Sequence, residues 1–323
     1  PGAIPVTGTA RFVRQPGNIT ITEVAITPGI GGAASTASTT ITTDPAVAGS
    51  PYTYNVAILD NTDFIGSNNS TVHTVNRAST TVTINSISPA VGPDIEVNET
   101  VTVSATVAAV APGEGTPNGT VQVRGTGGDA AATTGCDISL SGGTGTCQLS
   151  FSTKGGATLV FSYVQSANFA ASSNSQAVTV LGLPVTMTLT PPALPPYFGN
   201  SYDVGYSLSG GVGNFEGAVT LLADGVTAAS CVSTSAPLNN AGVCTFAAGQ
   251  NFGTYSLEGE YAGDTQDLPA SDTASLDILP ATTEITITTS PSSSAAGEPV
   301  SFDVGLTVTN GARSAMVRWP GCF

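Results

Sequence analysis

The sequence predicts an all-β chain built from tandem β-sandwiches, and three observations lead to that prediction. The 323 residues include 38 Gly and 21 Pro, which interrupt the chain with turns. Only 9% of the residues are charged, so the Lys, Glu and Arg that favour long helices are scarce. Short segments with apolar residues at every second position recur instead, as at Val101, Val103, Ala105 and Val107. Because 40% of the residues are hydrophobic, the chain can bury a core.

A repeat of about 100 residues organises these segments. The sequence Asp-Val-Gly occurs at 203–205 and again at 303–305, an offset of 100 residues. Gly-Thr-Val-Gln-Val at 119–123 matches Gly-Ala-Val-Thr-Leu at 217–221, and Gly-Thr-Ala-Arg-Phe at 8–12 is a further copy. A unit of this size, made of short alternating strands with Gly or Pro turns between them, is typical of an immunoglobulin-like β-sandwich.

We therefore expect an extended series of such units, with incomplete repeats at both ends. The four units are an incomplete repeat that lacks its first two strands (residues 1–78), two complete repeats (79–181 and 182–280) and the first strands of a further repeat (281–323). The linkers after 181 and after 278 are short and contain proline, which favours a rod over freely jointed beads.

Each complete unit is expected to contain the same strands in the same order. These strands cover residues 81–84, 101–107, 119–123, 159–163 and 177–181 in one unit, and 185–189, 202–208, 217–221, 255–261 and 274–278 in the next. Alternation within the fourth of these strands puts Phe161 and Tyr163, and likewise Leu257 and Tyr261, on one face. We expect these four side chains to point into the cores and not to form a ligand platform.

Four of the five cysteines form one matched pair in each complete unit. Ten residues separate Cys136 from Cys147, and twelve separate Cys231 from Cys244. Matched pairs in successive repeats favour disulfides over reduced buried thiols. Each would close a hairpin and stabilise it by about 3 kcal/mol in the chain-entropy model. Disulfides imply export through an oxidising compartment to the cell surface or the extracellular space. The fifth cysteine, Cys322, has no partner in this scheme.

The order of these features resembles a known bacterial repeat. It is similar to the immunoglobulin-like repeats that occur in tandem in large bacterial surface proteins and adhesins. The shared features, in order, are Gly-Thr-Val-x-Val, a cysteine pair, a strand with Tyr, and a loop with aromatic-x-x-Ser. The resemblance covers essentially the whole chain. It implies an immunoglobulin-like fold, and it implies roles as stalks, spacers, fibre subunits or accessory modules of exported enzymes.

Composition excludes several classes of function. Seven Lys and Arg against 22 Asp and Glu give a formal net charge of −15, which argues against nucleic-acid binding. No apolar run approaches the roughly 18 residues of a membrane span, so we expect no membrane insertion.

Residues suited to catalysis are scarce. The chain has one His and one Lys, with no nucleophile elbow, phosphate loop or paired-cysteine zinc spacing. The acidic pairs Asp60 with Asp63 and Asp264 with Asp267 are of the kind that hydrolyses glycosides, but Asp also favours turns strongly. We interpret both pairs as solvated turn residues, and we expect no enzyme, no cofactor and no metal.

The two ends of the chain suggest how copies of it interact. The first repeat lacks the counterpart of residues 80–115, which are 36 residues, whereas residues 281–313 are 33 residues that supply two strands of a fourth repeat. The apolar residues of the second spare strand are Val300, Phe302, Val304, Leu306 and Val308. One hypothesis is head-to-tail assembly, in which these strands complete the open first repeat of another copy. The alternative is an excerpt of a longer array, in which neighbouring repeats cover them.

These features predict an extracellular structural protein, a rod or filament subunit of tandem immunoglobulin-like domains. The alternatives are an adhesin stalk or a glycan- or protein-binding module cut from a longer array, and an accessory region of a secreted hydrolase. The predicted partners are copies of the chain or neighbouring repeats. Surface glycans are a further expectation, because five Asn-x-Ser/Thr triplets begin at Asn18, Asn68, Asn69, Asn98 and Asn118.

Overall fold

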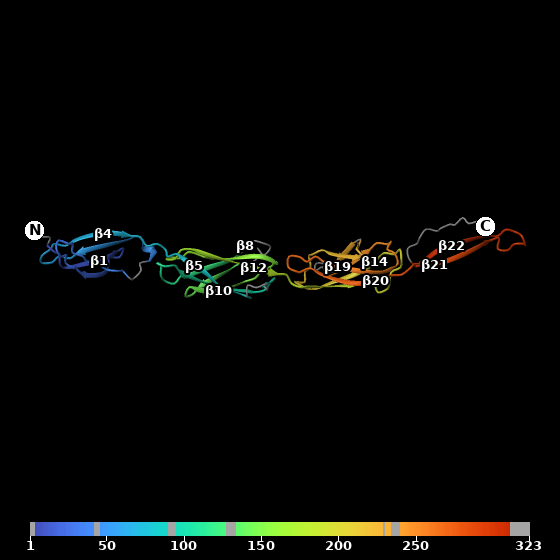
Figure 1. Ribbon diagram of the computed structural model, residues 1–323, viewed down its shortest axis with the longest axis horizontal. Helices are drawn as coiled ribbons and strands as arrows, with labels where there is room; N and C mark the ends of the chain where they lie inside the picture. Colours follow the sequence, from blue (N-terminus) through green and yellow to red (C-terminus); the bar gives the residue numbers. More distant parts are fainter. Residues whose placement is uncertain are drawn as a thin grey trace.

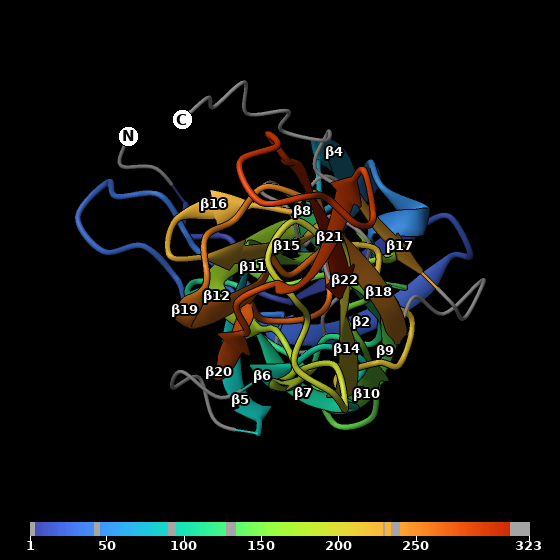
Figure 2. The same cartoon turned by 90° about the vertical axis from the view of Figure 1, so that its right-hand side faces the viewer.

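The computed structural model shows a series of β-rich units placed one after another along a single axis (Figure 1). It describes residues 4–41, 46–89, 95–126, 134–228, 230–233 and 240–310. Seen along that axis, the units lie one behind another, so the chain forms a rod (Figure 2). No helix in the described part of the chain is long and apolar enough to span a membrane.

The second unit along the rod is a sandwich of two sheets. Its strands are β5 (Thr80–Ser88), β6 (Ile95–Glu96), β7 (Val101–Ala109), β8 (Gly119–Thr126), β9 (Cys136–Leu140), β10 (Thr144–Leu149), β11 (Gly155–Tyr163) and β12 (Ser172–Leu181). One sheet has the order β10-β7-β5 and the other β6-β12-β11-β8-β9. Alternate residues of both sheets, such as Val103 and Phe161, are fully buried in one core.

The third unit repeats this architecture with four strands in each sheet. Its strands are β13 (Val185–Thr190), β14 (Tyr202–Gly210), β15 (Val219–Ala223), β16 (Val226–Thr227), β17 (Ser230–Ser233), β18 (Ala241–Phe246), β19 (Gly253–Tyr261) and β20 (Ala270–Ile278). The sheet orders are β13-β14-β18-β17 and β16-β15-β19-β20. The predicted all-β fold of tandem immunoglobulin-like sandwiches is confirmed.

The first unit and the last strands each form a single sheet. In the first unit, β1 (Thr9–Gln15), β2 (Ile19–Ala25), β3 (Tyr52–Ile58) and β4 (Ser67–His73) have the order β2-β1-β3-β4, and a 3-10 turn at Val47–Gly49 precedes β3. At the other end of the rod, β21 (Thr282–Ser290) and β22 (Ser301–Asn310) form a two-stranded antiparallel hairpin. Residues 311–323, with Cys322, lie outside the described residues.

The four predicted core residues are buried, as alternation in β11 and β19 requires. Phe161 and Leu257 have no exposed surface, and Tyr163 and Tyr261 are 1% exposed. Each tyrosine still finds a partner for its hydroxyl group, as a buried phenol requires. The Tyr163 hydroxyl donates to the carbonyl oxygen of Asn118 at 2.7 Å. The prediction that these side chains point inwards is therefore confirmed.

Replacing Phe161 with Ala should lower the free energy of unfolding of the second unit by about 3 to 5 kcal/mol, because a fully buried aromatic ring is removed from a packed core. Ser162→Ala, on the opposite face of β11, is the matched control. Hydrogen exchange of the β11 amides in increasing urea measures both changes. A loss below about 0.5 kcal/mol for Phe161→Ala would contradict the inward assignment.

Candidate functional site at the junctions between sandwiches

The linker between the second and third units is hydrogen-bonded to the third. The Leu183 N–H donates to the Gln266 carbonyl oxygen at 2.9 Å, and the Leu268 N–H donates to the Leu183 carbonyl oxygen at 2.9 Å. These two bonds form a parallel bridge between Leu183 and Asp267. The linker backbone is therefore held against the 262–269 loop, which joins β19 to β20.

The second unit contacts the same loop through the turn that precedes β11. The Lys154 N–H donates to the Thr265 carbonyl oxygen at 2.8 Å, and Lys154 Nζ donates to the Asp267 carbonyl oxygen at 2.6 Å. In the other direction, Gln266 Nε2 donates to the Ser152 carbonyl oxygen at 2.9 Å. Lys154 is the one lysine of the chain. These three hydrogen bonds, together with the linker bridge, fix the third unit against the second.

Asp264 organises the interior of this loop. Its Oδ1 accepts the N–H groups of Gln266 and Asp267, each at 2.8 Å. Its Oδ2 accepts the Glu216 N–H at 3.0 Å and the Tyr261 hydroxyl at 2.7 Å. Burial by itself would raise the pKa of Asp264, but these four donors outweigh burial and lower it below its ordinary value. Asp264 is therefore a structural anion whose two oxygens are both occupied.

Asp267 lies deeper in the junction, with no exposed surface. Its Oδ1 accepts the Val212 N–H at 2.8 Å, whereas Oδ2 has no hydrogen-bond partner among the described residues. Burial raises the pKa of Asp267; the nearby Asp264 charge adds to this rise, and the Val212 N–H and the Lys154 charge oppose it. The interpretation of Asp267 as a solvated turn residue is wrong, because the linker, the Lys154 turn and Gly211 enclose it.

Gly211 shows how closely the backbone approaches Asp267. Its φ is +55°, in the left-handed region, and a Cβ added there would lie 2.5 Å from Asp267 Oδ1. Any larger residue at this position would displace the carboxylate. The other predicted pair, Asp60 and Asp63, is exposed, and Asp60 accepts the Gly66 N–H within its own loop. Those two residues are solvated turn residues, as predicted.

The junction between the first and second units uses the same backbone arrangement. The Ala78 N–H donates to the Asn168 carbonyl oxygen, and the Ala170 N–H donates to the Ala78 carbonyl oxygen, both at 2.9 Å. Arg77 Nε donates to the Ser166 carbonyl oxygen at 3.0 Å. A parallel bridge and a basic side chain bound to a loop carbonyl therefore occur at both junctions. Sequence reasoning missed this recurrence because the bridge is made by backbone groups, which leave no side-chain motif.

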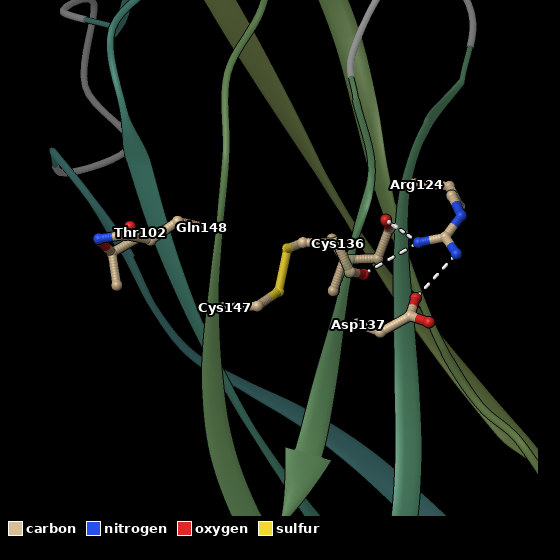
Figure 3. Close-up of a disulfide and its surroundings, with 7 residues drawn as sticks. Thr102, Arg124, Cys136, Asp137, Cys147 and Gln148 are labelled. Atoms are coloured by element: carbon tan, nitrogen blue, oxygen red, sulfur yellow. Dashed lines mark hydrogen bonds and ion pairs between the residues drawn. A yellow bond between two sulfur atoms is a disulfide. The ribbon is translucent and has the colours of Figure 1, made fainter.

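The two cysteine pairs are bonded in the structure but join different parts of their units. Cys136 on β9 is bonded to Cys147 on β10, with a Cα–Cα distance of 6.0 Å, and these strands belong to opposite sheets (Figure 3). We expected each pair to close a hairpin; β9 and β10 are indeed joined by a tight turn, but they belong to different sheets, so this disulfide also ties the two layers together. Cys231 and Cys244 face each other on neighbouring strands of one sheet, 3.9 Å apart at Cα.

A charged contact fixes the edge strand that carries Cys136. Arg124 on β8 donates through Nη1 to the Cys136 carbonyl oxygen at 2.9 Å and through Nη2 to Asp137 Oδ1 at 2.7 Å (Figure 3). On the other side of the disulfide, Gln148 donates to Thr102 Oγ1 at 3.3 Å. The cysteine pair thus links two strands that are each held to their own sheet.

The remaining predicted residues lie on the surface. On β22 the exposed fractions are 67% for Phe302, 58% for Val304 and 46% for Leu306. Val308 on the same strand and Val300, which precedes it, are half-buried. The five asparagines of the Asn-x-Ser/Thr triplets are exposed: Asn18, Asn68, Asn69, Asn98 and Asn118. Among the described residues, no group of three or more His, Cys, Asp or Glu side chains is arranged to hold a metal ion.

No protein-family model and no curated protein matches the chain. Among solved structures, it is similar to the fibronectin(III)-like modules of Clostridium thermocellum CbhA, with 20% identity, coverage of 62% of this chain and 94% of that one, and a TM-score of 0.27. It is also similar to FdeC, an Escherichia coli adhesin, with 16% identity, coverage of 73% of this chain and 74% of that one, and a TM-score of 0.27. Immunoglobulin domains 1–5 of Sidekick-1 match with 11% identity, coverage of 98% of this chain and 65% of that one, and a TM-score of 0.34. These likenesses concern the fold alone.

Peptide mapping without reductant should recover two linked pairs, Cys136 with Cys147 and Cys231 with Cys244, because the sulfur atoms of each pair are in bonding contact. Reduction should lower the free energy of unfolding of each complete unit by about 2 to 4 kcal/mol. Free thiols at all four positions, or crossed pairing, would contradict this prediction and would remove the argument for an oxidising compartment.

Asp264 and Asp267 should give the third unit opposite pH dependences. The lowered pKa of Asp264 stabilises the folded unit above the ordinary carboxyl pKa of about 3.9, and this stabilisation is lost as the pH falls below that value. The raised pKa of Asp267 has the reverse effect: its contribution is most favourable below about pH 3.9 and declines as the pH rises through the folded-state pKa.

Two matched variants separate these effects. Asp267→Asn keeps an oxygen for the Val212 N–H and removes the buried charge, so stability at pH 7 should be unchanged or higher, and the decline in stability above about pH 3.9 should diminish. Asp264→Asn leaves two of the four donors unpaired and should lower stability at pH 7 by about 2 kcal/mol. Hydrogen exchange of the β19 and β20 amides measures both. If Asp267→Asn is destabilised and Asp264→Asn is unaffected, the assignment of Asp264 as the stabilising carboxylate and Asp267 as the destabilising one is wrong.

Proposed function

We propose that the chain is an extracellular structural protein, a rod of tandem immunoglobulin-like domains that keeps whatever lies at its two ends a fixed distance apart. The proposal rests on one arrangement, here called the closure, that recurs at both of these junctions. It consists of a parallel backbone bridge, at Ala78 or at Leu183, and a basic side chain, Arg77 or Lys154, that binds a loop carbonyl. A linker that rotated freely could not keep these hydrogen bonds. The closure therefore favours a defined angle between neighbouring sandwiches.

Two further features support this role. The units follow one axis, as a spacer requires (Figures 1 and 2). The disulfides in both complete units suit an oxidising environment outside the cytosol. We assign the chain to the extracellular space or the cell surface on these grounds.

We assign the chain no catalytic role and no cofactor. Both carboxylate oxygens of Asp264 are occupied by donors from its own unit, so this group is not available as a general acid or base. Asp267 has no exposed surface through which a substrate could reach it. Asp60 and Asp63 lie in an exposed loop. The acidic pairs support a structural role better than glycoside hydrolysis.

The double variant Lys154→Met with Gln266→Ala should loosen the second junction. It removes two side-chain hydrogen bonds that cross the junction, each worth about 1 kcal/mol, and leaves the cores intact. Small-angle X-ray scattering, at a dilution that keeps the chain monomeric, should give the long, narrow distance distribution of a straight rod. In the variant, the maximum dimension should shorten and the distribution should broaden.

Arg11→Met is the control, because it removes one exposed positive charge from the first unit and touches no residue of the second junction. Its scattering profile should match that of the parent chain. If the parent chain is already flexible, or if the double variant scatters like the control, the rod proposal is wrong.

A further inference from the structure

The β21–β22 hairpin presents an apolar face to solvent. Its register pairs Ile285 with Leu306 and Ile287 with Val304, so these side chains share one face. Ile285 is 60% exposed and Ile287 is 63% exposed. A two-stranded hairpin is marginally stable in water, and a contiguous exposed apolar patch marks an interaction surface.

The same positions are core positions in the two complete units. The Asp-Val-Gly repeat aligns Phe302 with Tyr202 and Val304 with Val204, which are 6% and 0% exposed. Leu306 corresponds to Tyr206, which is 6% exposed. In the third unit, the cover over these side chains is the facing sheet β16-β15-β19-β20.

The first unit has the facing sheet, but the cover over it is partial: Ala10 and Tyr52 on its inner face are 0% and 6% exposed, and the middle of that face is more open. The pair Phe12 with Val56 corresponds by register to Val123 with Phe161, which are fully buried, yet Phe12 and Val56 are only half-buried. A groove lined by Phe12, Ile21, Tyr54 and Val56 runs along this face; residues 39–41 and 46–47 and residues of the second unit also line it. Within residues 4–41 and 46–78, the structure describes one sheet only.

Arg14 on the same face has a side-chain nitrogen that no described group satisfies. Its guanidinium lies 5.2 Å from the ring centre of Tyr52 on the same face of the sheet. Its Nε is buried and has no hydrogen-bond partner among the described residues. A buried polar atom without a partner is uncommon in a complete domain.

We propose that the β21–β22 hairpin of one chain packs onto the open β2-β1-β3-β4 sheet of a second copy. The choice of a second copy follows from the chain itself: in both complete units a sheet of this type is covered by a sheet that contains an equivalent strand pair, β5 with β7 and β13 with β14. The hairpin and the open sheet lie at opposite ends of the rod (Figure 1), so a chain cannot join its own ends without breaking the junctions. The contact is heterologous and does not close, and therefore builds a filament.

The proposal deepens the rod proposal by naming its partner, and it rests on that proposal for the straight path between donor and acceptor. Two variants test it. Val304→Asp places a charge on the hairpin face and leaves the open sheet intact, whereas Val56→Asp places one on the open sheet and leaves the hairpin intact. Light scattering after size exclusion, with negative-stain micrographs, measures the assembly state.

The parent chain should form polymers that lengthen with concentration. Each variant alone should be monomeric, because one has no working donor and the other no working acceptor. Mixed in equal amounts, the two variants should form a heterodimer and nothing longer, since one productive contact remains between them. This outcome holds even if Val56→Asp unfolds the first unit, because the hairpin of that variant is unchanged.

Thr286→Asp and Asn55→Asp are the matched controls, because they place the same charge on the opposite faces of β21 and β3. Both should polymerise like the parent chain. A parent chain that stays monomeric at micromolar concentration overturns the proposal and leaves neighbouring repeats of a longer array as the cover. Dimers that Val304→Asp abolishes but Val56→Asp does not would mean hairpin-to-hairpin pairing and also overturn it.

These outcomes are separate from a failure of the rod proposal. Monomers with the scattering of a straight rod would remove the head-to-tail contact and leave the rod. Polymers whose individual chains are bent at the second junction would contradict the rod proposal and leave the head-to-tail contact in place.

Discussion

A β-sheet with one apolar face is stable in water only when a second layer covers that face, and the whole chain is organised by this requirement. In the second and third units the cover is local: strands from the same 100-residue stretch form both layers, and the core residues of both lose contact with solvent. The first unit and the β21–β22 hairpin each have one layer in the described residues. Their half-buried and exposed apolar side chains lack a full second layer among the described residues, and the proposed contact with a second copy would supply one.

The junctions follow from a different requirement, because they are polar. The loop at each junction presents carbonyl oxygens that accept donors from the neighbouring unit or from the linker. A carbonyl that such a contact removes from water needs a donor of this kind. Ala78 and Leu183 supply backbone donors, and Arg77 and Lys154 supply charged ones. Only seven residues of the chain are Lys or Arg, and two of them serve this purpose. The orientation of neighbouring sandwiches thus depends on a few directional contacts.

Sequence reasoning predicted the sandwiches because alternation and the repeat are local signals. Val101 to Val107, for instance, alternate in a way that only a half-buried strand explains, and they form β7 with every second residue in the core. It did not predict which sheet each strand joins. The cysteine pairs occupy equivalent places in the two repeats, yet Cys136–Cys147 spans two sheets and Cys231–Cys244 lies within one. Sheet membership depends on long-range pairing, which spacing alone does not encode.

The burial of Asp267 escaped prediction for the same reason, and it shows what the junction requires. In isolation, the 262–269 loop would leave this carboxylate in water, and an asparagine would accept the Val212 N–H equally well. The buried charge disfavours folding of the third unit, since burial raises the pKa of Asp267. The negative charge is also attracted to Lys154, which reaches across from the second unit and binds the carbonyl of the same residue. The charge therefore makes the third unit less stable, whereas the backbone carbonyl of the same residue binds Lys154 and holds that unit to the second.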